Sequence, residues 1–171
     1  MPHAEQICQQ ILRDFPQHAE ALQLLGIIAY QVGDYRIATS LITQAIEIDS
    51  NQSSFFYNLG NVLGEQGRLE ESIEAYHQAI HLQPEHANAY NNLGIALKNC
   101  NKFLESLDVF QAALKIDPKH HLSNFNLGDL YVKFNEIEKA TNCFKKAISF
   151  KPNFSLAYST YLFFINYSDK Y

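Results

Sequence analysis

Three asparagines, Asn58, Asn92 and Asn126, stand at equal intervals in the sequence. A side-chain amide offers two hydrogen-bond donors and one acceptor, so it can pair with both the N–H and the C=O groups of a peptide backbone. A regularly spaced row of such amides is suited to holding an extended peptide, whatever the side chains of that peptide are. The other interpretation is that these amides bond within the protein itself. The sequence alone leaves both interpretations open.

Other residues with chemical potential are arranged less favourably. His77 and His81 have a spacing that can bind zinc on one helix face, but no third ligand stands at a matching position, and we predict a surface pair. The cysteines, Cys8, Cys100 and Cys143, form no CxxC pair. Such a scattered set predicts a reducing, cytoplasmic location rather than a disulfide framework. We therefore predict a chain without a cofactor, a metal site or a catalytic centre.

Composition narrows the range of partners. The chain has 171 residues, 47% of them hydrophobic, and a net charge of -5, which argues against a nucleic-acid partner. It contains no run of apolar residues long enough to span a membrane, so we expect no membrane partner. Residues 1–86 carry 11 acidic and 3 basic side chains, whereas residues 87–171 carry 7 and 10. This asymmetry is either a drift in composition or a sign of molecules that stack head to tail.

The three asparagines recur every 34 residues, and other residue types recur with the same period. Glycines, bulky residues and small residues each return at a fixed place in the period. The series are Gly26, Gly60, Gly94 and Gly128; Ile42, Tyr76, Phe110 and Phe144; and Ala45, Ala79, Ala113 and Ala147. Apolar residues spaced by three and four predict two amphipathic helices in each period. The small residues allow two helix backbones to approach, and the bulky residue fills the space beside them.

Two local features refine this prediction. Between the two helices of each period stands a residue type that tolerates a left-handed backbone and so ends a helix at little cost; these residues are Gly33, Gly67, Asn101 and Asn135. In the second period we expect the first helix to bury Phe56, Leu59, Gly60 and Leu63.

This pattern resembles the tetratricopeptide repeat family, whose repeats are helix–turn–helix units of the same length. The resemblance implies an all-α fold, in which stacked repeats form a superhelix, or α-solenoid, with a concave groove that binds proteins. We expect a single domain over residues 1–171, with ten helices of about 12–14 residues each. It comprises a half repeat at 2–16 that is a second helix, full repeats at 19–52, 53–86, 87–120 and 121–154, and a half repeat at 155–171 that is a first helix.

In this family the groove is lined by the side of the first helix that is opposite its packed side. A rotation of about 100° per residue places a largely polar set there. These predicted groove residues are Asn58, Asn61, Asn88, Asn92, Asn99, Asn126, Asp129 and Lys133. We expect them to bind a protein or an extended peptide, so that the chain acts as a scaffold.

A closer resemblance concerns the "NLG" motif, whose asparagine is the one that recurs in register, and the ending "NFSLAYSTYLFFINYSDKY". Both are similar to the repeats of O-linked N-acetylglucosamine transferases and their bacterial relatives. The resemblance implies that Asn58, Asn92 and Asn126 belong to a ladder that holds substrate polypeptide. Leu24 and Thr160 occupy the same register and depart from it, so any ladder is short. The implied alternative function is the substrate-recognition arm of a protein glycosyltransferase whose catalytic domain is absent here.

The last predicted helix has apolar residues on nearly every side. An uncovered apolar patch usually marks an interface. We therefore expect this helix to pack on another chain, on another part of a longer protein, or as a swapped element. A further alternative function is self-assembly, in which the terminal half repeats form a homo-oligomer. The predicted interface residues are Tyr158, Tyr161, Leu162, Phe163, Phe164 and Tyr167.

Overall fold

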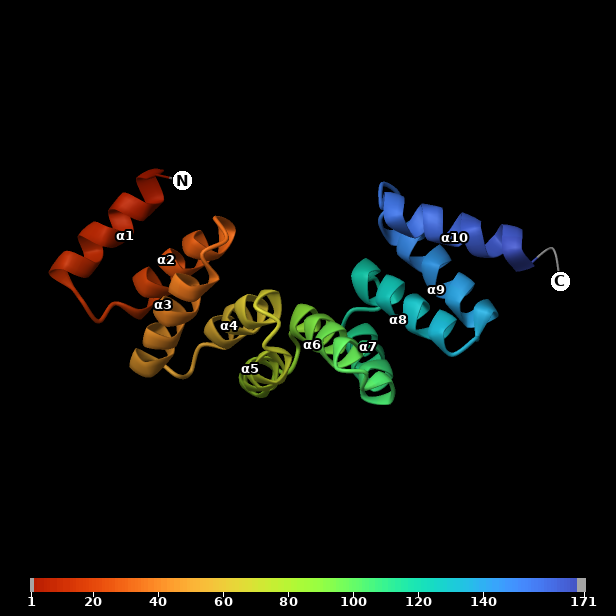
Figure 1. Cartoon of the computed structure of the whole chain (residues 1–171), viewed down its shortest axis with the longest axis horizontal. Coiled ribbons are helices and arrows are strands. Elements are labelled where there is room, and N and C mark those ends of the chain that lie inside the picture. The colour runs from red at the N-terminus through yellow and green to blue at the C-terminus, as the bar shows by residue number, and fades with distance from the viewer. Residues whose placement is uncertain (1, 169–171) are drawn as a thin grey trace. The chain divides into compact units, whose positions relative to one another are not determined.

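The computed structural model describes residues 2–168, which form ten α-helices and no strand (Figure 1). Their bounds are α1 (Pro2–Asp14), α2 (Ala19–Gln31), α3 (Tyr35–Ile48), α4 (Ser53–Glu65), α5 (Leu69–Leu82), α6 (Ala87–Asn99), α7 (Phe103–Ile116), α8 (His121–Lys133), α9 (Ile137–Phe150) and α10 (Ser155–Ser168). The predicted all-α fold of helix–turn–helix repeats is confirmed.

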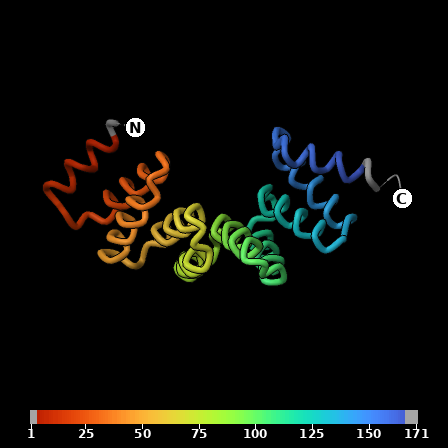
Figure 2. The backbone as a smooth tube through the Cα atoms, in the orientation of Figure 1, coloured from red at the N-terminus to blue at the C-terminus, as the bar shows by residue number. Residues whose placement is uncertain are grey.

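The chain divides into two compact units, which we call the N-terminal unit (residues 1–84) and the C-terminal unit (residues 85–171). The N-terminal unit contains α1 and the hairpins α2–α3 and α4–α5, and the C-terminal unit contains the hairpins α6–α7 and α8–α9 and then α10. Figure 2 traces the backbone through both units. The expected single domain and its repeat boundaries stay a prediction.

Each hairpin is held together by the same close contact between its two helices. A methyl group added to the glycine of the first helix would lie 2.6 Å from the bulky residue of the second helix in all four hairpins. The four contacts are Gly26 with Ile42, Gly60 with Tyr76, Gly94 with Phe110, and Gly128 with Phe144. Only glycine fits here, because any Cβ atom would overlap the neighbouring side chain.

Serine adds a hydrogen bond to this contact in two of the hairpins. Ser72 Oγ donates to the backbone oxygen of Gly60, and Ser106 Oγ donates to that of Gly94, both at 2.7 Å. Both serines are buried. Ala38 and Ala140 stand at the corresponding positions of the other two hairpins, so the sequence pattern indicates a small residue there but not the hydrogen bond.

The turns within the hairpins have the predicted backbone conformation. The φ angle is 83° at Gly33, 73° at Gly67, 61° at Asn101 and 59° at Asn135. A left-handed residue ends the first helix and allows the chain to reverse. Glycine and asparagine recur here because other residue types adopt this conformation only with strain.

The expectation for the first helix of the second repeat is wrong in part. Phe55 and Val62 are almost fully buried, with 2% and 1% of their surface exposed, whereas Phe56 and Leu59 are only half-buried. The reason is that α4 packs on two neighbours, its own partner α5 and the preceding helix α3. A prediction that assumed one packed side therefore missed the residues that face α3.

Three first helices are each preceded by a histidine that caps them. The Nδ1 atoms of His18, His86 and His120 accept hydrogen bonds from the backbone N–H groups of Ala21, Ala89 and Ser123, at 3.3, 3.2 and 3.2 Å. The first N–H groups of a helix have no partner within the helix, so such a cap stabilises it. An Nδ1 that accepts a hydrogen bond carries no proton, so the caps of α6 and α8 require the neutral forms of His86 and His120.

Candidate functional site

Within the C-terminal unit, polar contacts join the first helices α6 and α8 along most of their length. Near the start of the helices, His120 Nε2 lies 2.9 Å from Asn88 Oδ1. Near their ends, Lys98 Nζ donates to Asp129 Oδ2 at 2.6 Å. We call this surface the α6–α8 face, and define it by Asn88, Asn91, Asn92, Lys98, Ser123, Asn126 and Asp129.

Asn91 is the centre of the α6–α8 face and is only 2% exposed. Its Oδ1 accepts from Asn126 Nδ2 at 3.0 Å and from Ser123 Oγ at 3.2 Å, while its Nδ2 donates to Asn92 Oδ1 at 3.0 Å. One buried amide therefore fixes the orientation of two predicted groove asparagines. Because the amide nitrogen of Asn126 points towards Asn91, its oxygen points away and forms no hydrogen bond with the described residues.

His120 supports the same network from the start of α8. Its Nδ1 accepts from the Ser123 N–H, so the proton is on Nε2, which donates to Asn88 Oδ1. Ser123 Oγ lies 2.7 Å from the same Nδ1. Burial lowers the pKa of His120 from its ordinary value, partly offset by the carboxylate of Asp117. Burial thus favours the neutral imidazole that this arrangement requires.

A cleft of about 470 Å³ lies at the other end of the α6–α8 face. Its lining includes Lys98, Asn99, Asp129 and Lys133, together with Phe103 from the first turn of α7. Lys133 Nζ lies 4.2 Å from the centre of the Phe103 ring, a cation–π contact. Two ammonium groups and one carboxylate leave the cleft with a net positive charge, so it is suited to a carboxylate or to backbone carbonyl groups.

The structure divides the predicted groove residues between the two units. Six of them lie on the α6–α8 face or at its cleft: Asn88, Asn92, Asn99, Asn126, Asp129 and Lys133. Asn58 and Asn61 belong to the N-terminal unit. Asn58 is half-buried on α4, and Asn61 Oδ1 accepts a hydrogen bond from Tyr76 Oη at 2.8 Å. Asn61 thus contributes to the contact between α4 and α5.

Sequence reasoning missed Asn91, Ser123 and His120. The available signal was a polar residue at a position that is apolar in neighbouring repeats. Tyr57 and Phe125 stand one repeat on either side of Asn91, and the counterparts of Ser123 are Ala89 and Phe55. A buried polar residue at such a position needs a hydrogen-bond partner, which indicates a network.

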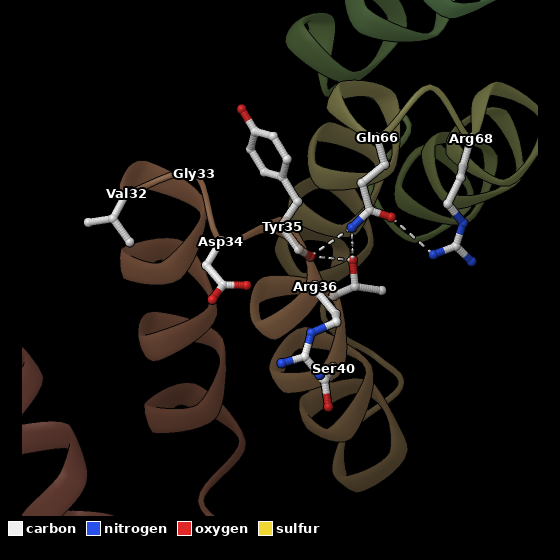
Figure 3. A pocket seen from close by; sticks show the side chains of 9 residues that line it. Val32, Gly33, Asp34, Tyr35, Arg36, Ser40, Gln66 and Arg68 are labelled. Atoms are coloured by element: carbon white, nitrogen blue, oxygen red, sulfur yellow. Dashed lines mark hydrogen bonds between the residues drawn. The ribbon is translucent and has the colours of Figure 1, made fainter.

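A second cleft, of about 780 Å³, lies in the N-terminal unit beside the turns that follow α2 and α4 (Figure 3). Gln66 crosses it, because its Nε2 donates to the backbone oxygen of Tyr35 at 2.7 Å and to Thr39 Oγ1 at 2.9 Å. The cleft is also lined by Asp34, Arg36 and Arg68.

Arg68 donates to Gln66 Oε1 at 3.1 Å and forms an ion pair with Glu71. The carboxylates of Asp34 and Glu71 balance the two guanidinium groups of Arg36 and Arg68, so this second cleft has no excess charge with which to hold an ion. None of the predicted site residues lines it.

The predicted interface helix α10 packs on α9. Tyr158, Leu162 and Phe163 are 44%, 53% and 63% exposed. Tyr161 is half-buried, as is Phe164, whose ring stacks on Phe144 with 6.1 Å between ring centres. The side chain of Tyr167 lies outside the described residues. No helix in residues 2–168, α10 included, is both long and apolar enough to cross a membrane.

Repeated hairpins with a glycine-to-bulky contact, and first helices that present polar side chains, define a helical repeat protein. Tetratricopeptide repeat models match residues 41–74, 60–99, 87–120 and 122–154, which together make up more than half of the chain. The chain therefore belongs to the tetratricopeptide repeat family.

The individual proteins that the chain resembles have low sequence identity to it. Tetratricopeptide repeat protein 7B of Homo sapiens is 28% identical over 76 residues, which is 44% of this chain and 9% of that protein. The chain thus spans less than a tenth of the length of this relative. The crystal structure of MamA has a TM-score of 0.79 at 21% identity, covering 86% of each chain. That of YrrB, described as a TPR protein with an unusual peptide-binding site, has a TM-score of 0.76 at 24% identity, covering 93% of this chain and 82% of YrrB. These two likenesses show the fold.

Proposed function

We propose that the chain is a non-catalytic scaffold that binds an extended segment of a partner protein on the α6–α8 face. The observation that carries this proposal is the buried amide of Asn91, which holds Asn92 and Asn126 in fixed orientations. Side chains that are already ordered lose little entropy when they bind a ligand. The peptide-binding site ascribed to YrrB agrees with such a use of this fold.

The chemistry of the α6–α8 face favours the backbone of the bound segment over its side chains. The outward oxygen of Asn126 is an acceptor for a peptide N–H group. Each such hydrogen bond contributes about 0.5–1.5 kcal/mol net, so we expect modest affinity and little sequence preference. At the cleft, the ammonium groups of Lys98 and Lys133 add a preference for an acidic residue at one end of the segment.

The test uses a peptide selected from a random-peptide library by binding to the chain, with affinity measured by fluorescence anisotropy. We expect the double variant Asn92→Ala/Asn126→Ala to bind it roughly 5-fold to 100-fold more weakly, because two backbone hydrogen bonds are lost. Asn142→Ala is the matched control, since Asn142 is an exposed asparagine on α9, outside the α6–α8 face. Unchanged affinity in a double variant that retains its helicity would refute the proposal.

The second candidate function is the recognition arm of a protein glycosyltransferase of the O-linked N-acetylglucosamine transferase kind. What supports it is the register of Asn58, Asn92 and Asn126. It requires a sugar-nucleotide domain outside residues 1–171, and the peptide on the α6–α8 face would then be a substrate. Sequencing the complete gene tests it, because a reading frame without such a domain would exclude this function.

A cytoplasmic location is part of the same proposal. Cys8 and Cys143 are buried and Cys100 is half-buried, and all three are free thiols. Burial raises the pKa of Cys143, which keeps this thiol protonated and unreactive. Fractionation of cells that produce the protein tests the location, and recovery outside the cytoplasm would exclude it.

A further inference from the structure

His120 stands at the N-cap of α8 and uses both of its ring nitrogens. The Nδ1 atom accepts a hydrogen bond from the backbone N–H of Ser123 at 3.2 Å, which caps the helix. The Nε2 atom lies 2.9 Å from Asn88 Oδ1 on α6. Because a neutral imidazole carries one proton, an accepting Nδ1 leaves Nε2 as the donor. One imidazole thus joins the start of α8 to a side chain of the α6–α8 face.

This contact determines which end of the Asn88 amide is available to a ligand. A side-chain amide has an oxygen that accepts hydrogen bonds and a nitrogen that donates them. Since the oxygen of Asn88 is turned towards His120, the nitrogen points away, and it forms no hydrogen bond with the described residues. Asn88 is exposed, so this donor is accessible. Asn126 has the opposite polarity, because its nitrogen is turned towards Asn91 and its oxygen points away.

The two outward groups match the backbone of an extended segment. Each residue of such a segment carries an N–H and a C=O group, and a neighbouring strand pairs with both. Asn88 Nδ2 is a donor for a C=O group, and Asn126 Oδ1 is an acceptor for an N–H group. If Asn88 were turned over, its oxygen would face the C=O group, and two acceptors form no hydrogen bond. The orientation of Asn88 therefore decides whether it binds the segment.

The pair of Asn88 and His120 does not follow from the repeat itself. Two repeats earlier, in the N-terminal unit, the corresponding residues are Glu20 and Gln52. Their side chains have other partners, because Gln52 Nε2 donates to Asp49 Oδ2 at 2.8 Å and Glu20 Oε2 lies 3.2 Å from His18 Nδ1. The fold of the repeat forms without this contact.

We propose that His120 is a positioning residue of the α6–α8 face, which holds Asn88 with its amide nitrogen outward to donate to a backbone C=O group of the bound segment. This inference rests on the proposed function, because it concerns the same segment. His120 does not bind the segment itself and acts through Asn88. Asn88 and Asn126 then bind both kinds of backbone group, which makes the face selective for peptide backbone.

Two substitutions separate this positioning from the helix cap. In His120→Asn a short side-chain oxygen can cap α8, as Asp34 Oδ1 caps α3 at 3.0 Å, but the side chain is too short to hold Asn88. His120→Gln places an amide nitrogen near the position of Nε2 but is a poor cap, since Gln52 at the N-cap of α4 forms no side-chain cap hydrogen bond. We expect His120→Asn to lose affinity and keep its stability, and His120→Gln to do the reverse. A purely structural role would change affinity and stability in the same direction in both variants.

Affinity is measured by fluorescence anisotropy with the library-selected peptide, and stability by denaturant unfolding. We expect His120→Asn and Asn88→Ala each to bind about 2-fold to 12-fold more weakly, because one hydrogen bond is lost. The double variant His120→Asn/Asn88→Ala should bind no more weakly than Asn88→Ala alone, because His120 acts through Asn88. His18→Asn is the matched control, since His18 caps α2 in the same way in the N-terminal unit, and its affinity should be unchanged. Additive losses in the double variant, or unchanged affinity in His120→Asn, would overturn the proposal.

Nuclear magnetic resonance of the imidazole nitrogens tests the arrangement without a peptide. At neutral pH we expect the proton of His120 on Nε2. A proton on Nδ1 would turn the nitrogen of Asn88 inward and would overturn the proposal. Failure of the proposed function gives a different result, in which Asn92→Ala/Asn126→Ala binds the peptide as well as the unchanged chain. Weaker binding by that variant, together with unchanged binding by His120→Asn, would refute this inference alone.

Discussion

The helices of the N-terminal and C-terminal units correspond residue for residue in the repeat, but the contacts between first helices differ in the two units. In the C-terminal unit, buried Asn91 and Ser123 form hydrogen bonds between α6 and α8. Their counterparts two repeats earlier, on α2 and α4, are Gln23 and Phe55, and Phe55 packs in an apolar cluster with Ala19 and Leu22.

Apolar packing stabilises such a contact at least as well as a buried polar network does. Stability therefore does not explain the asparagines of the α6–α8 face. The proposed peptide binding accounts for them, because Asn91 orients side chains that an apolar contact could not provide.

The largest effect is expected where the two units are alike, in the hairpin contact. Phe110→Ala should lower the free energy of unfolding by about 3–5 kcal/mol, because it leaves a cavity beside Gly94. Ile42→Ala in the N-terminal unit should cost about 2–5 kcal/mol for the same reason. Denaturant unfolding followed by circular dichroism measures both, with exposed Leu104→Ala as the control. Similar values for Phe110→Ala and the control would show that this contact does not hold the hairpin together.

A smaller effect should separate the units. Asn91→Ala leaves Asn126 Nδ2 without its acceptor, whereas Ser123 Oγ keeps His120 Nδ1 at 2.7 Å. The lost hydrogen bonds of Asn91 should cost about 1–3 kcal/mol. Gln23→Ala, at the corresponding position of α2, removes a half-buried side chain with no hydrogen bond among the described residues, so it should change stability by less than about 0.5 kcal/mol. The same denaturant measurement applies. Equal costs for the two substitutions would contradict the contrast between the units.

Acid should weaken the C-terminal unit through its histidine caps. Burial lowers the pKa of His120 and of His86 in the folded chain below the ordinary value of 6.5. The unfolded chain therefore binds protons first as pH falls. The caps contribute fully above pH 6.5, and their contribution is lost as pH falls from 6.5 through the lower folded values.

Thermal unfolding measured from neutral to mildly acidic pH tests this loss. His120→Asn keeps a good cap that does not titrate, so the midpoint of this variant should fall less on acidification than that of the unchanged chain. His86 and His121 retain lowered pKa values, so part of the pH dependence should remain. An equal fall in both proteins would exclude the His120 cap as a cause.

The smallest effect is expected at the ion pair of Lys98 with Asp129. Its side chains are 24% and 50% exposed, so water and salt screen it, and Lys98→Ala should cost about 0.2–1 kcal/mol. The cost should shrink when salt is added. A cost that is large and independent of salt would mean that Lys98 contributes through packing instead.

The repeat architecture could be predicted from sequence because its determinants recur. Gly94 and Phe110 are informative since the same pair of residue sizes returns in every hairpin, and Asn101 marks a turn because few residue types tolerate its backbone. The burial of Phe55 could not be predicted in the same way, because it depends on a second neighbouring helix. Asn91 was missed because its type occurs at that position in one repeat only, and its role depends on Ser123 and Asn126, which belong to the next repeat.

The most direct measurement of the central claim is nuclear magnetic resonance of the ¹⁵N-labelled chain during titration with the library-selected peptide. The side-chain amide signals of Asn92 and Asn126 report on the proposed contacts, and that of Asn142 is the reference. We predict that the first two shift together and saturate with the peptide while Asn142 stays unchanged. Saturable shifts elsewhere, for example at Gln66 in the cleft of the N-terminal unit, with Asn92 and Asn126 unchanged, would contradict the account.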